Sequence, residues 1–278
     1  MPELPEVETV RRGLTNLVKN AVINSVEVRY LKMVSPESPL FEQALQGKTI
    51  ERIDRRGKYL LFRFNDHLTM VSHLRMEGKY DVQPEGSVVT KHTHVIFHLS
   101  DGRELRYTDT RKFGRMRLIN TGDESVIPGL KAMGPEPTEK TLKLDYMKKI
   151  FRKSHRTIKP FLLDQSKIAG LGNIYVDETL WLSQINPLQQ TDELPDEKIA
   201  DLRDAIIDEI GIAIKGHGTT VHSFSTAFGE AGNFQNHLHV YGKQGEPCER
   251  CGTTIEKIKV AQRGTHFCPH CQPIIGDK

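Results

Sequence analysis

Apolar residues recur along the chain with two different periods. Residues 3–19 carry apolar side chains at spacings of three and four, which predicts a helix with one apolar face: Val7, Val10, Leu14 and Leu17. Shorter alternating or continuous apolar runs, typical of β-strands, follow; they are Val26–Tyr30, Leu60–Phe64, Leu68–Val71, His94–Leu99, Leu105–Tyr107 and Met116–Ile119. Glycine-containing turns separate these runs, so we expect an α+β fold in which a helix leads into an antiparallel β-sandwich.

The pattern changes after the proline-rich stretch Gly134–Pro137, which we interpret as a linker. The apolar spacing then becomes helical, and one long face is formed by Ile199, Leu202, Ile206, Ile210 and Ala213. A tight glycine turn at residues 169–173 runs into another helix. Such a turn presents backbone N–H groups at the positive end of a helix and favours a phosphate, with glycines used only for close packing as the alternative.

The four cysteines form two CxxC pairs in one C-terminal segment: Cys248, Cys251, Cys268 and Cys271. This spacing is typical of a tetrahedral thiolate site for one Zn²⁺ ion, with a β-hairpin between the pairs. A disulfide is the alternative, disfavoured in a chain without a signal peptide, and His266 or His270 could replace one thiolate. Four thiolates close the coordination shell, so we interpret the zinc as structural and expect catalysis elsewhere.

Composition and charge narrow the class of protein. The chain has 278 residues, of which 37% are hydrophobic and 27% charged, as in soluble globular proteins, and no apolar run approaches the roughly 20 residues that cross a bilayer. We therefore expect a cytoplasmic protein without membrane contact, and a monomer because no heptad repeat is present. Basic residues gather in segments 48–63, 103–117 and 146–159, whereas acids gather in 192–209. This segregation favours a basic face for nucleic acid, against the alternative of an ordinary solvated surface.

The chain starts with Met1-Pro2-Glu3, and removal of Met1 would leave the secondary amine of Pro2 beside a carboxylate. A terminal amine has a pKa of about 7.7–8.0, against about 10.4 for lysine, and the positive end of a helix lowers it further. Amines of this kind attack electrophilic carbon in covalent catalysis. Pro2 is therefore a candidate nucleophile, although a small second residue that merely permits methionine removal is the plainer interpretation.

Six longer motifs spread over nearly the whole chain: PELPEVETVRRGL (2–14), RRGKYLLF (55–62), SHLRMEGKY (72–80), DTRKFG (109–114), KPFLLDQSKIAGLGNIYVDE (159–178) and KVAQRGTHFCPHCQ (259–272). In sequence and in order they resemble the motifs of the bacterial formamidopyrimidine-DNA glycosylase family. The resemblance implies a sandwich domain (1–133), a helix-two-turn-helix domain (134–234) and a zinc β-hairpin (235–278). It also implies a base excision repair enzyme of the bacterial cytoplasm, associated with the nucleoid through its partner, damaged double-stranded DNA.

The resemblance assigns the chemistry to matching positions. The family excises oxidised purines such as 8-oxoguanine and formamidopyrimidines and then cuts the strand at the abasic site. Pro2 would attack C1′ of the damaged nucleotide to form an iminium link, Glu3 would transfer protons, and Glu6 would support both. Lys58 matches the family lysine beside the scissile phosphate, Arg263 matches the arginine of the zinc hairpin, and both count with Pro2 and Glu3 as catalytic residues. Successive β- and δ-elimination would then release both phosphates without a metal.

Further positions match DNA contacts. His92, Lys153 and Asn173 match residues that hold the backbone. Three others would fill the space left by the flipped lesion, which offsets a few kcal/mol of unstacking: Met76, Arg111 and Phe113. Core packing is the alternative for the methionine and the phenylalanine. Glu77 matches a pocket position, and His73 is a candidate support residue.

One loop departs from the family pattern. In the family this lesion-capping loop closes over the flipped purine through backbone N–H groups. Where relatives usually read Gly-Gly-(Ser/Thr)-(Ser/Thr)-(Ile/Val)-Arg, this chain has Gly216-His217-Gly218, followed by Thr219, Thr220, Val221, His222 and, two residues on, Phe224. A histidine thus replaces the arginine, and another splits the glycine pair. We predict that excision of 8-oxoguanine is weaker than excision of ring-opened purines and weaker than cleavage of abasic sites. A tolerated loop change with ordinary activity is the alternative.

Three other functions stay open at this point. A sister glycosylase for oxidised pyrimidines shares the architecture, but its start usually reads PEGPE, and Leu4 argues against it. A non-catalytic damage-binding protein would result if Met1 stays on the chain and blocks the amine. A zinc-dependent transcription regulator is disfavoured, because one zinc hairpin after a sandwich offers no recognition-helix dimer.

Overall fold

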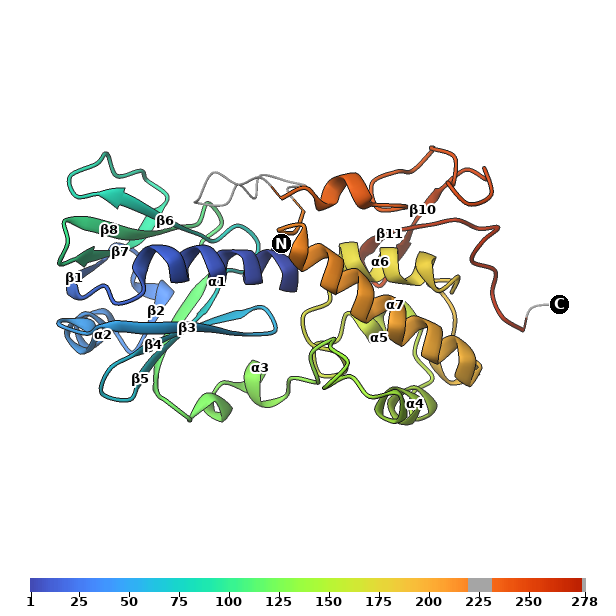
Figure 1. The fold of residues 1–278 in the computed structure, drawn as a ribbon, viewed down its shortest axis with the longest axis horizontal. Coiled ribbons are helices and arrows are strands. Elements are labelled where there is room, and N and C mark those ends of the chain that lie inside the picture. The colour runs from blue at the N-terminus through green and yellow to red at the C-terminus, as the bar shows by residue number, and fades with distance from the viewer. Residues whose placement is uncertain (220–231, 277–278) are drawn as a thin grey trace. The chain divides into compact units, whose positions relative to one another are not determined.

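The computed structural model describes residues 1–219 and 232–276 and divides into two compact units. The first unit contains residues 1–131 together with the described residues around His217 and Gly232. The second contains residues 132–216 and the described residues from Asn233 onward. Figure 1 colours the elements of both units in chain order.

The first helix of the chain, α1 (Leu4–Val18), begins with a capping box. Glu3 is the N-cap, its side chain accepts the backbone N–H of Glu6, and the Glu6 side chain in turn accepts the backbone N–H of Glu3. Pro5 in the first turn is pre-organised for the helix because its φ angle is fixed. Val7, Val10 and Leu14 of the predicted apolar face are buried, Leu17 is half-buried, and the helix packs on strand β3 (Figure 1).

Two sheets form the sandwich of the first unit. The larger has the strand order β2-β9-β5-β4-β3 and the smaller the order β1-β7-β8-β6. The pairs are antiparallel except for the two-residue pair of β2 with β9, which is parallel. The strands are β1 (Ile23–Val28), β2 (Val34–Ser35), β3 (Ile50–Arg56), β4 (Tyr59–Phe64), β5 (Leu68–His73), β6 (Lys79–Pro84), β7 (Thr93–Leu99), β8 (Arg103–Thr108) and β9 (Arg115–Asn120).

The larger sheet is apolar on both faces, which explains the continuous apolar runs of β4 and β5. One face contributes Phe62 to the core that also holds Leu14 and Tyr107. The other face contributes Leu61 and Val71 to a second cluster, which is covered from the segment of α3 (Pro128–Lys131). The remaining helices of this unit are η1 (Leu31–Met33), α2 (Ser38–Leu45) and η2 (Glu124–Val126).

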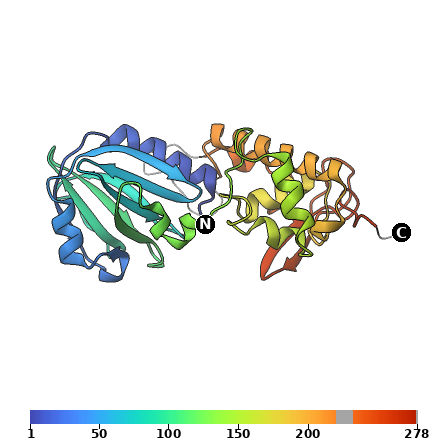
Figure 2. The same cartoon turned by 90° about the horizontal axis from the view of Figure 1, so that it is seen from below.

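Helices dominate the second unit, where the five predicted apolar positions of α7 are all buried. Helix α7 packs against α6 and α4, and Figure 2 shows the orange α7 beside the green α4. The helices are α4 (Leu144–Arg152), α5 (Ile158–Leu162), α6 (Asn173–Leu182), η3 (Thr191–Glu193), α7 (Asp196–Lys215) and η4 (Phe234–His237). Among the described residues, no helix has the length and apolar character that a bilayer crossing demands.

A two-stranded antiparallel hairpin follows, made of β10 (Glu256–Val260) and β11 (Arg263–Phe267). The two turn residues Ala261 and Gln262 both have positive φ angles, 45° and 63°. Two-residue turns of this kind match the twist of the flanking strands. The turn therefore places Arg263 at the first position of β11.

The expected α+β fold is confirmed: a leading helix, an antiparallel sandwich, a helical region and a C-terminal hairpin are all present. Two details differ from expectation. The pair of β2 with β9 is parallel. The stretch Gly134–Pro137 is more than a linker, because the Gly134 N–H donates to the Gln165 carbonyl and the Pro135 carbonyl accepts the Ala169 N–H, each at 2.9 Å.

Candidate functional site

The start of the chain is enclosed by the fold of the first unit. Pro2 is buried and Glu3 is 3% exposed, whereas Met1 is 47% exposed. Every residue of the first turns of α1, Leu4 to Val10, is buried, including the carboxylates Glu6 and Glu8. Buried carboxylates are uncommon unless they are paired or functional. The beginning of α1 is therefore the candidate centre of chemistry in this unit.

Glu6 connects the start of the chain to the loop that follows Gly216, for which the sequence predicts lesion capping. Its Oε2 accepts the Glu3 backbone N–H at 2.8 Å, and its Oε1 accepts the Thr219 N–H at 2.8 Å and the Thr219 hydroxyl at 3.2 Å. Gly218 has a φ angle of +75°, and a Cβ there would lie 2.6 Å from Glu6 Oε1. His217, also in the left-handed region at φ 60°, is exposed. The predicted loop residues Thr220, Val221, His222 and Phe224 lie outside the described residues.

Lys58 lies in a two-residue turn that the sheet and α1 hold together. Gly57 has a left-handed φ of 56°, and Lys58 itself is 5% exposed. Arg55 donates from Nη1 to the Gly57 carbonyl and from Nε to Glu8 Oε2, both at 3.0 Å. Burial alone would raise the pKa of Glu8, but hydrogen bonds from Arg11, Arg12 and Arg55 lower it to about 2.

Glu8 and its arginines were not predicted as part of the site. Their signal was available, because Arg11 and Arg12 follow Glu8 at the helical spacings of three and four. Arg55, by contrast, reaches Glu8 across 47 positions of sequence. Only the folded sheet reveals that contact.

His73, at the end of β5, lies beside this turn. Its ring meets Tyr59 edge-on, with ring centroids 4.5 Å apart, and its Nδ1 accepts the backbone N–H of Arg75 at 2.9 Å. Burial, together with the charges of Arg75 and Lys58, lowers the pKa of His73 to about 3. The ring is therefore neutral near pH 7 and serves as an acceptor.

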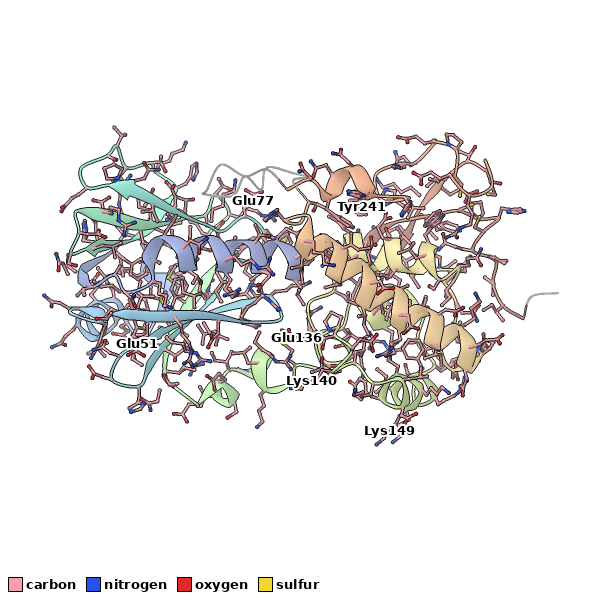
Figure 3. The ribbon with its side chains drawn as sticks, in the orientation of Figure 1. Glu51, Glu77, Glu136, Lys140, Lys149 and Tyr241 are labelled. Carbon is pink, nitrogen blue, oxygen red and sulfur yellow. The ribbon has the colours of Figure 1, made fainter. Side chains whose placement is uncertain are left out.

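The predicted void-filling residues lie on two loops of the first unit. Met76 is half-buried, and Phe113 is a large apolar side chain that is 47% exposed. The Arg111 guanidinium lies 4.7 Å from the centroid of the Phe113 ring. The Thr110 hydroxyl donates to Glu77, which is exposed and labelled in Figure 3. An exposed phenylalanine stacked with a cation suits a surface that meets nucleobases.

His92 lies at the base of the second of these loops. It is half-buried, and its backbone carbonyl accepts the Asp109 N–H at 3.0 Å. The described contacts of His92 thus support the loop from the backbone. Asp109, which sequence reasoning did not single out, is the buried residue that organises this loop.

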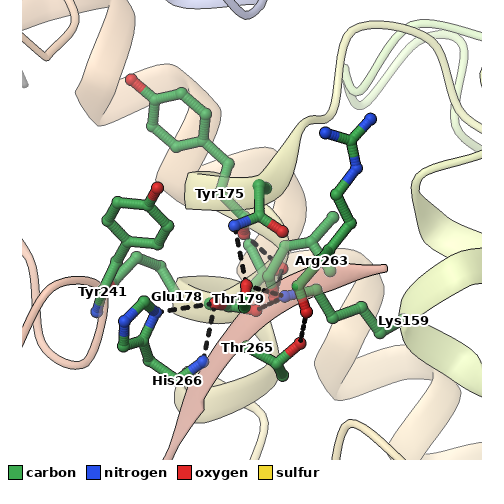
Figure 4. Close-up of polar contacts among 12 residues, drawn as sticks. Lys159, Tyr175, Glu178, Thr179, Tyr241, Arg263, Thr265 and His266 are labelled. Atoms are coloured by element: carbon green, nitrogen blue, oxygen red, sulfur yellow. Dashed lines mark hydrogen bonds and ion pairs between the residues drawn. The ribbon is translucent and has the colours of Figure 1, made fainter. Parts of the chain in front are cut away.

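In the second unit, Asn173 and Lys159 hold the turn end of the zinc hairpin. Asn173 Nδ2 donates to the Gly264 carbonyl at 2.9 Å, and Lys159 Nζ donates to the same carbonyl at 3.0 Å. Gly264 directly follows Arg263, whose side chain extends away from the hairpin in Figure 4. The asparagine that the sequence singled out therefore bonds to the residue next to the singled-out arginine.

A buried ion pair supports this arrangement. Lys159 and Asp177 are 0% and 1% exposed, and Lys159 Nζ lies 2.5 Å from Asp177 Oδ1. Asp177 Oδ2 accepts the backbone N–H of His266 at 2.9 Å and lies 3.3 Å from its Nδ1 (Figure 4). His266 thus faces a carboxylate rather than the cysteines. Sequence reasoning missed the lysine and the aspartate, although both lie within the motif of residues 159–178.

Part of the basic segment 146–159 pairs with the acidic segment 192–209. Lys148 and Arg152 both pair with Asp196, at 3.0 and 2.7 Å. Lys149 and Lys153 are exposed and have no acidic partner within the described ranges, and Lys149 points away from α4 in Figure 3. Folding therefore reduces this segment to a few cations available to a polyanion.

The four cysteines form the predicted metal site. Their sulfur atoms lie within 4.8 Å of one another, with Cys248 and Cys271 3.9 Å apart and Cys251 and Cys268 3.5 Å apart. Tetrahedral zinc with Zn–S bonds of about 2.3 Å requires sulfur separations of about 3.8 Å. The donor set and its dimensions fit one structural Zn²⁺, and the site is packed against Trp181, Val240 and Ile255. 

The sandwich and the zinc hairpin, with carboxylates buried at the start of α1, define a class of zinc-containing proteins with a helix-two-turn-helix region. Residues 1–116 match the formamidopyrimidine-DNA glycosylase N-terminal domain, residues 133–225 match its H2TH domain, and residues 245–274 match the zinc finger found in FPG and IleRS. The chain belongs to the formamidopyrimidine-DNA glycosylase family.

Individual relatives agree with this assignment. The formamidopyrimidine-DNA glycosylase of Lactiplantibacillus plantarum is 66% identical over 97% of this chain and 98% of its own length. That of Pediococcus pentosaceus is 61% identical over 98% and 99%. The Lactococcus lactis Fpg complex with DNA containing an abasic site has a TM-score of 0.92 at 46% identity, covering 98% of this chain and 99% of that one. A second Lactococcus lactis complex, with DNA containing N7-benzyl-Fapy-dG, has a TM-score of 0.92 at 47% identity, covering 98% and 100%.

Proposed function

We propose that this chain is a bifunctional DNA glycosylase and abasic-site lyase of base excision repair that excises oxidised purines from damaged double-stranded DNA. Its family membership and the DNA complexes of its relatives support this function. The observation that carries it is the enclosed start of α1, where buried Pro2 and Glu3 adjoin the Glu6 carboxylate. We place its action in the bacterial cytoplasm, on the DNA of the nucleoid.

Pro2 is the nucleophile in this proposal, once Met1 is removed. Its neutral nitrogen attacks C1′ of the flipped nucleotide, and the C1′–N9 bond breaks with its electron pair on the base. The new ammonium at Pro2 loses its N–H proton, and the departing base takes up a proton in exchange. Glu3 protonates the ring oxygen as the sugar opens, which produces an iminium ion. Loss of a C2′ proton then drives β-elimination, which releases one phosphate. A second, δ-elimination releases the other phosphate. Water finally hydrolyses the iminium and frees Pro2.

Glu6 holds this arrangement together in the proposal. Both of its oxygens accept hydrogen bonds, one from the backbone of Glu3 and one from Thr219. The same carboxylate therefore fixes both the acid next to the nucleophile and Thr219 of the lesion-capping loop. Glu77, Thr219 and the residues Thr220, Val221, His222 and Phe224 are assigned to lesion binding.

Phosphate contacts are proposed in each unit. In the first, Lys58 holds the scissile phosphate from a turn fixed by Arg55, and His92 contributes from the base of its loop. In the second, Asn173 and Arg263 act from α6 and the zinc hairpin, with Lys153 at the end of α4. The zinc-bound hairpin keeps Arg263 in place, and zinc takes no part in the reaction.

Met76, Arg111 and Phe113 fill the space that the flipped nucleotide leaves. The apolar pair replaces stacking, and the guanidinium donates to the unpaired base opposite the lesion. Their arrangement supports this role, since Arg111 lies against the exposed Phe113 ring. We also propose three domains with the boundaries 1–133, 134–234 and 235–278.

Borohydride trapping on a duplex with one 8-oxoguanine tests the proposal. We expect a covalent adduct that maps to Pro2, and an intact mass that lacks Met1. Glu3→Gln should slow base excision about 100-fold or more, whereas the matched control Glu51→Gln, on an exposed position of β3 (Figure 3), should not. An adduct on a lysine, or no adduct from a chain trimmed to Pro2, would refute the mechanism.

The lesion panel tests the finer prediction. Excision of 8-oxoguanine should be slower than excision of a formamidopyrimidine and slower than cleavage of an abasic site in matched duplexes. Equal or faster release of 8-oxoguanine would show that the histidines of the capping loop are tolerated. Faster release of oxidised pyrimidines would point to the sister activity.

A further inference from the structure

The loops that carry Met76 and the Arg111–Phe113 pair cross between the two sheets at the same place. The first loop leaves the larger sheet after His73 and enters the smaller sheet at Lys79, while the second leaves the smaller sheet after Thr108 and enters the larger one at Arg115. His73 is paired with Arg115, and Lys79 with Thr108. The two crossings are therefore neighbours that run in opposite directions.

A buried tyrosine lies between the bases of these crossings. Tyr107 is 0% exposed, and a Cβ on Gly78 or Gly114 would lie 2.0 or 1.7 Å from its hydroxyl oxygen. One glycine belongs to each loop, and only the absence of a side chain lets both approach the phenol. Because Tyr107 is enclosed and its ring also meets Tyr80 edge-on at 5.1 Å, it cannot turn aside. A shift of one loop is therefore felt by the other.

Asp109 fixes the shape of the second loop. Its carboxylate accepts the backbone N–H of Arg111 at 2.9 Å through Oδ1, and those of Phe113 and Gly114 at 2.9 and 2.8 Å through Oδ2. Its carbonyl accepts a hydrogen bond from His94 Nε2 at 2.7 Å. Asp109 is 1% exposed, so these hydrogen bonds are shielded from water and are correspondingly strong.

The tips of the loops are also joined. The Thr110 hydroxyl of the second loop donates to the Glu77 carboxylate of the first. Arg115 NH1 donates to the carbonyls of Lys112 and Gly114 at 3.0 and 2.6 Å, which closes the second loop from the other side. The loops are thus connected at the base by Tyr107 and at the tip by one hydrogen bond.

We propose that Asp109 is a positioning residue: it fixes the second loop, so that the two loops, joined at Tyr107 and at the Thr110–Glu77 hydrogen bond, enter the duplex as one rigid wedge. Asp109 thereby sets how strictly Arg111 selects the base opposite the lesion. This inference rests on the proposed void-filling role of Met76, Arg111 and Phe113. Asp109 touches neither the lesion nor the reacting atoms. It acts by fixing the backbone from which the cation and the ring extend.

Asp109→Asn tests the inference, because the amide keeps the size of the side chain but turns an NH₂ group toward N–H donors. Hydrogen exchange should become about tenfold faster at the amides of Arg111, Phe113 and Gly114, a readout that needs no activity. Excision from a duplex should fall about 10- to 100-fold, since small displacements of aligned groups have effects of that size. The ratio of rates between the best and the worst opposite base should shrink toward one.

Single-stranded DNA with one abasic site separates the wedge from the chemistry. It has no stack to fill, so borohydride trapping by Asp109→Asn should stay within about twofold of the unsubstituted chain, and any larger loss would count against a positioning role. If the unsubstituted chain traps neither substrate, the proposed function fails, while hydrogen exchange still decides whether Asp109 holds the loop.

Two further variants make the test specific. Asp101→Asn is the matched control, since Asp101 accepts the Arg103 N–H at 3.2 Å in the β7–β8 turn and should affect neither exchange nor base selection. Thr110→Val removes only the tip hydrogen bond and should narrow the opposite-base ratio less than Asp109→Asn does. Unchanged exchange, or an equal loss of rate against all four opposite bases, would overturn the proposal.

Discussion

The two units of the molecule hold their functional groups by different physical means. In the first unit, buried carboxylates accept backbone N–H groups: Glu6 from Glu3 and Thr219, and Asp109 from three residues of its own loop. In the second, the hairpin that carries Arg263 is held by four thiolates and by the Lys159–Asp177 ion pair.

The difference follows from the amount of core available to each element. The loops of the first unit extend from two packed sheets, so a few hydrogen bonds are enough to fix them. A hairpin of two strands is marginally stable by itself and needs a metal or further contacts. Disturbing the metal or the ion pair should therefore have larger effects than disturbing single side chains of the sandwich.

Loss of zinc should have the largest effect. Structural zinc contributes about 10 kcal/mol or more to the folding of small finger domains, so Cys248→Ser or chelation should unfold the hairpin and release Arg263. Trp181, the only tryptophan, packs in the cluster that contains Cys248, and its fluorescence reports the change. Duplex binding should fall at least about 100-fold, while hydrogen exchange in the sandwich stays slow.

Restoring zinc to the chelated protein serves as the control and should recover both fluorescence and binding. Cys248→Ser should not recover fully. Unaltered Trp181 emission and duplex affinity after verified zinc removal would show that the hairpin is held by the protein contacts alone.

Breaking the buried ion pair should have the next largest effect. Lys159→Met leaves the Asp177 carboxylate buried without its cation, which costs about 3–5 kcal/mol in comparable cases. Urea unfolding followed by Trp181 fluorescence measures this loss. The double variant Lys159→Met/Asp177→Asn should recover part of it, because the amide removes the charge and still accepts the His266 N–H.

Lys148→Met is the matched control for that change. Lys148 pairs with Asp196 at the surface, at 3.0 Å, and its loss should lower the free energy of unfolding by less than about 1 kcal/mol. Equal losses from Lys148→Met and Lys159→Met would mean that burial does not strengthen the inner pair.

The contrast also explains what sequence could predict. Local patterns predicted α1, the zinc thiolates and the apolar face of α7, because each depends on spacing within one segment. Motif resemblance added Asn173 and Arg263 individually. Neither source showed that Asn173 bonds to the carbonyl of Gly264, the residue after Arg263, since 91 positions separate Asn173 from Gly264.

Sequence also could not show which charges pair in the fold. Segments 146–159 and 192–209 look segregated in sequence, but folding brings Lys148 and Arg152 to Asp196. Short elements such as α2 and α5 were also missed, because their few apolar positions do not establish a period. Contacts between distant segments depend on strand pairing and helix packing, which local spacing does not contain.

Glu209 makes the stability of the second unit depend on pH. Unlike Glu6 and Asp109, its Oε1 has no hydrogen-bond partner within the described part of the chain. Burial and the nearby Glu178 raise the pKa of Glu209 to about 8 from its ordinary 4.5. The folded state therefore keeps its proton while the unfolded state loses it, so stability falls as pH rises from about 4.5 to 8.

Glu209→Gln should remove this dependence, because the amide is neutral at every pH. Between pH 5 and pH 8 the variant should gain on the order of 3 kcal/mol relative to the unsubstituted chain, measured by urea unfolding with Trp181 fluorescence. Glu197→Gln, in the first turn of the same helix, should show no such gain. A constant difference across this pH range would mean that Glu209 is ionised in the folded protein.

His73, in the first unit, should contribute the smallest pH dependence of stability, opposite in sign to that of Glu209. Its folded-state pKa of about 3 lies below the ordinary 6.5, so only the unfolded chain takes up a proton as pH falls. The stability that the neutral ring supports is complete above about pH 6.5 and declines toward pH 3.

In His73→Asn, the amide oxygen can still accept the Arg75 N–H, but the side chain at this position no longer titrates. From pH 7 to pH 5 the unsubstituted chain should lose about 1 kcal/mol more than the variant, a value reduced by the partial exposure of the ring. Hydrogen exchange in peptides covering β4 and β5 measures this loss within the sandwich, and His67→Asn, in the exposed β4–β5 turn, is the control. Parallel pH profiles for His73→Asn and the unsubstituted chain would show that the His73 ring takes up a proton in the folded state as readily as in the unfolded state. The opposite pH dependences expected for His73 in the first unit and Glu209 in the second would then be lost.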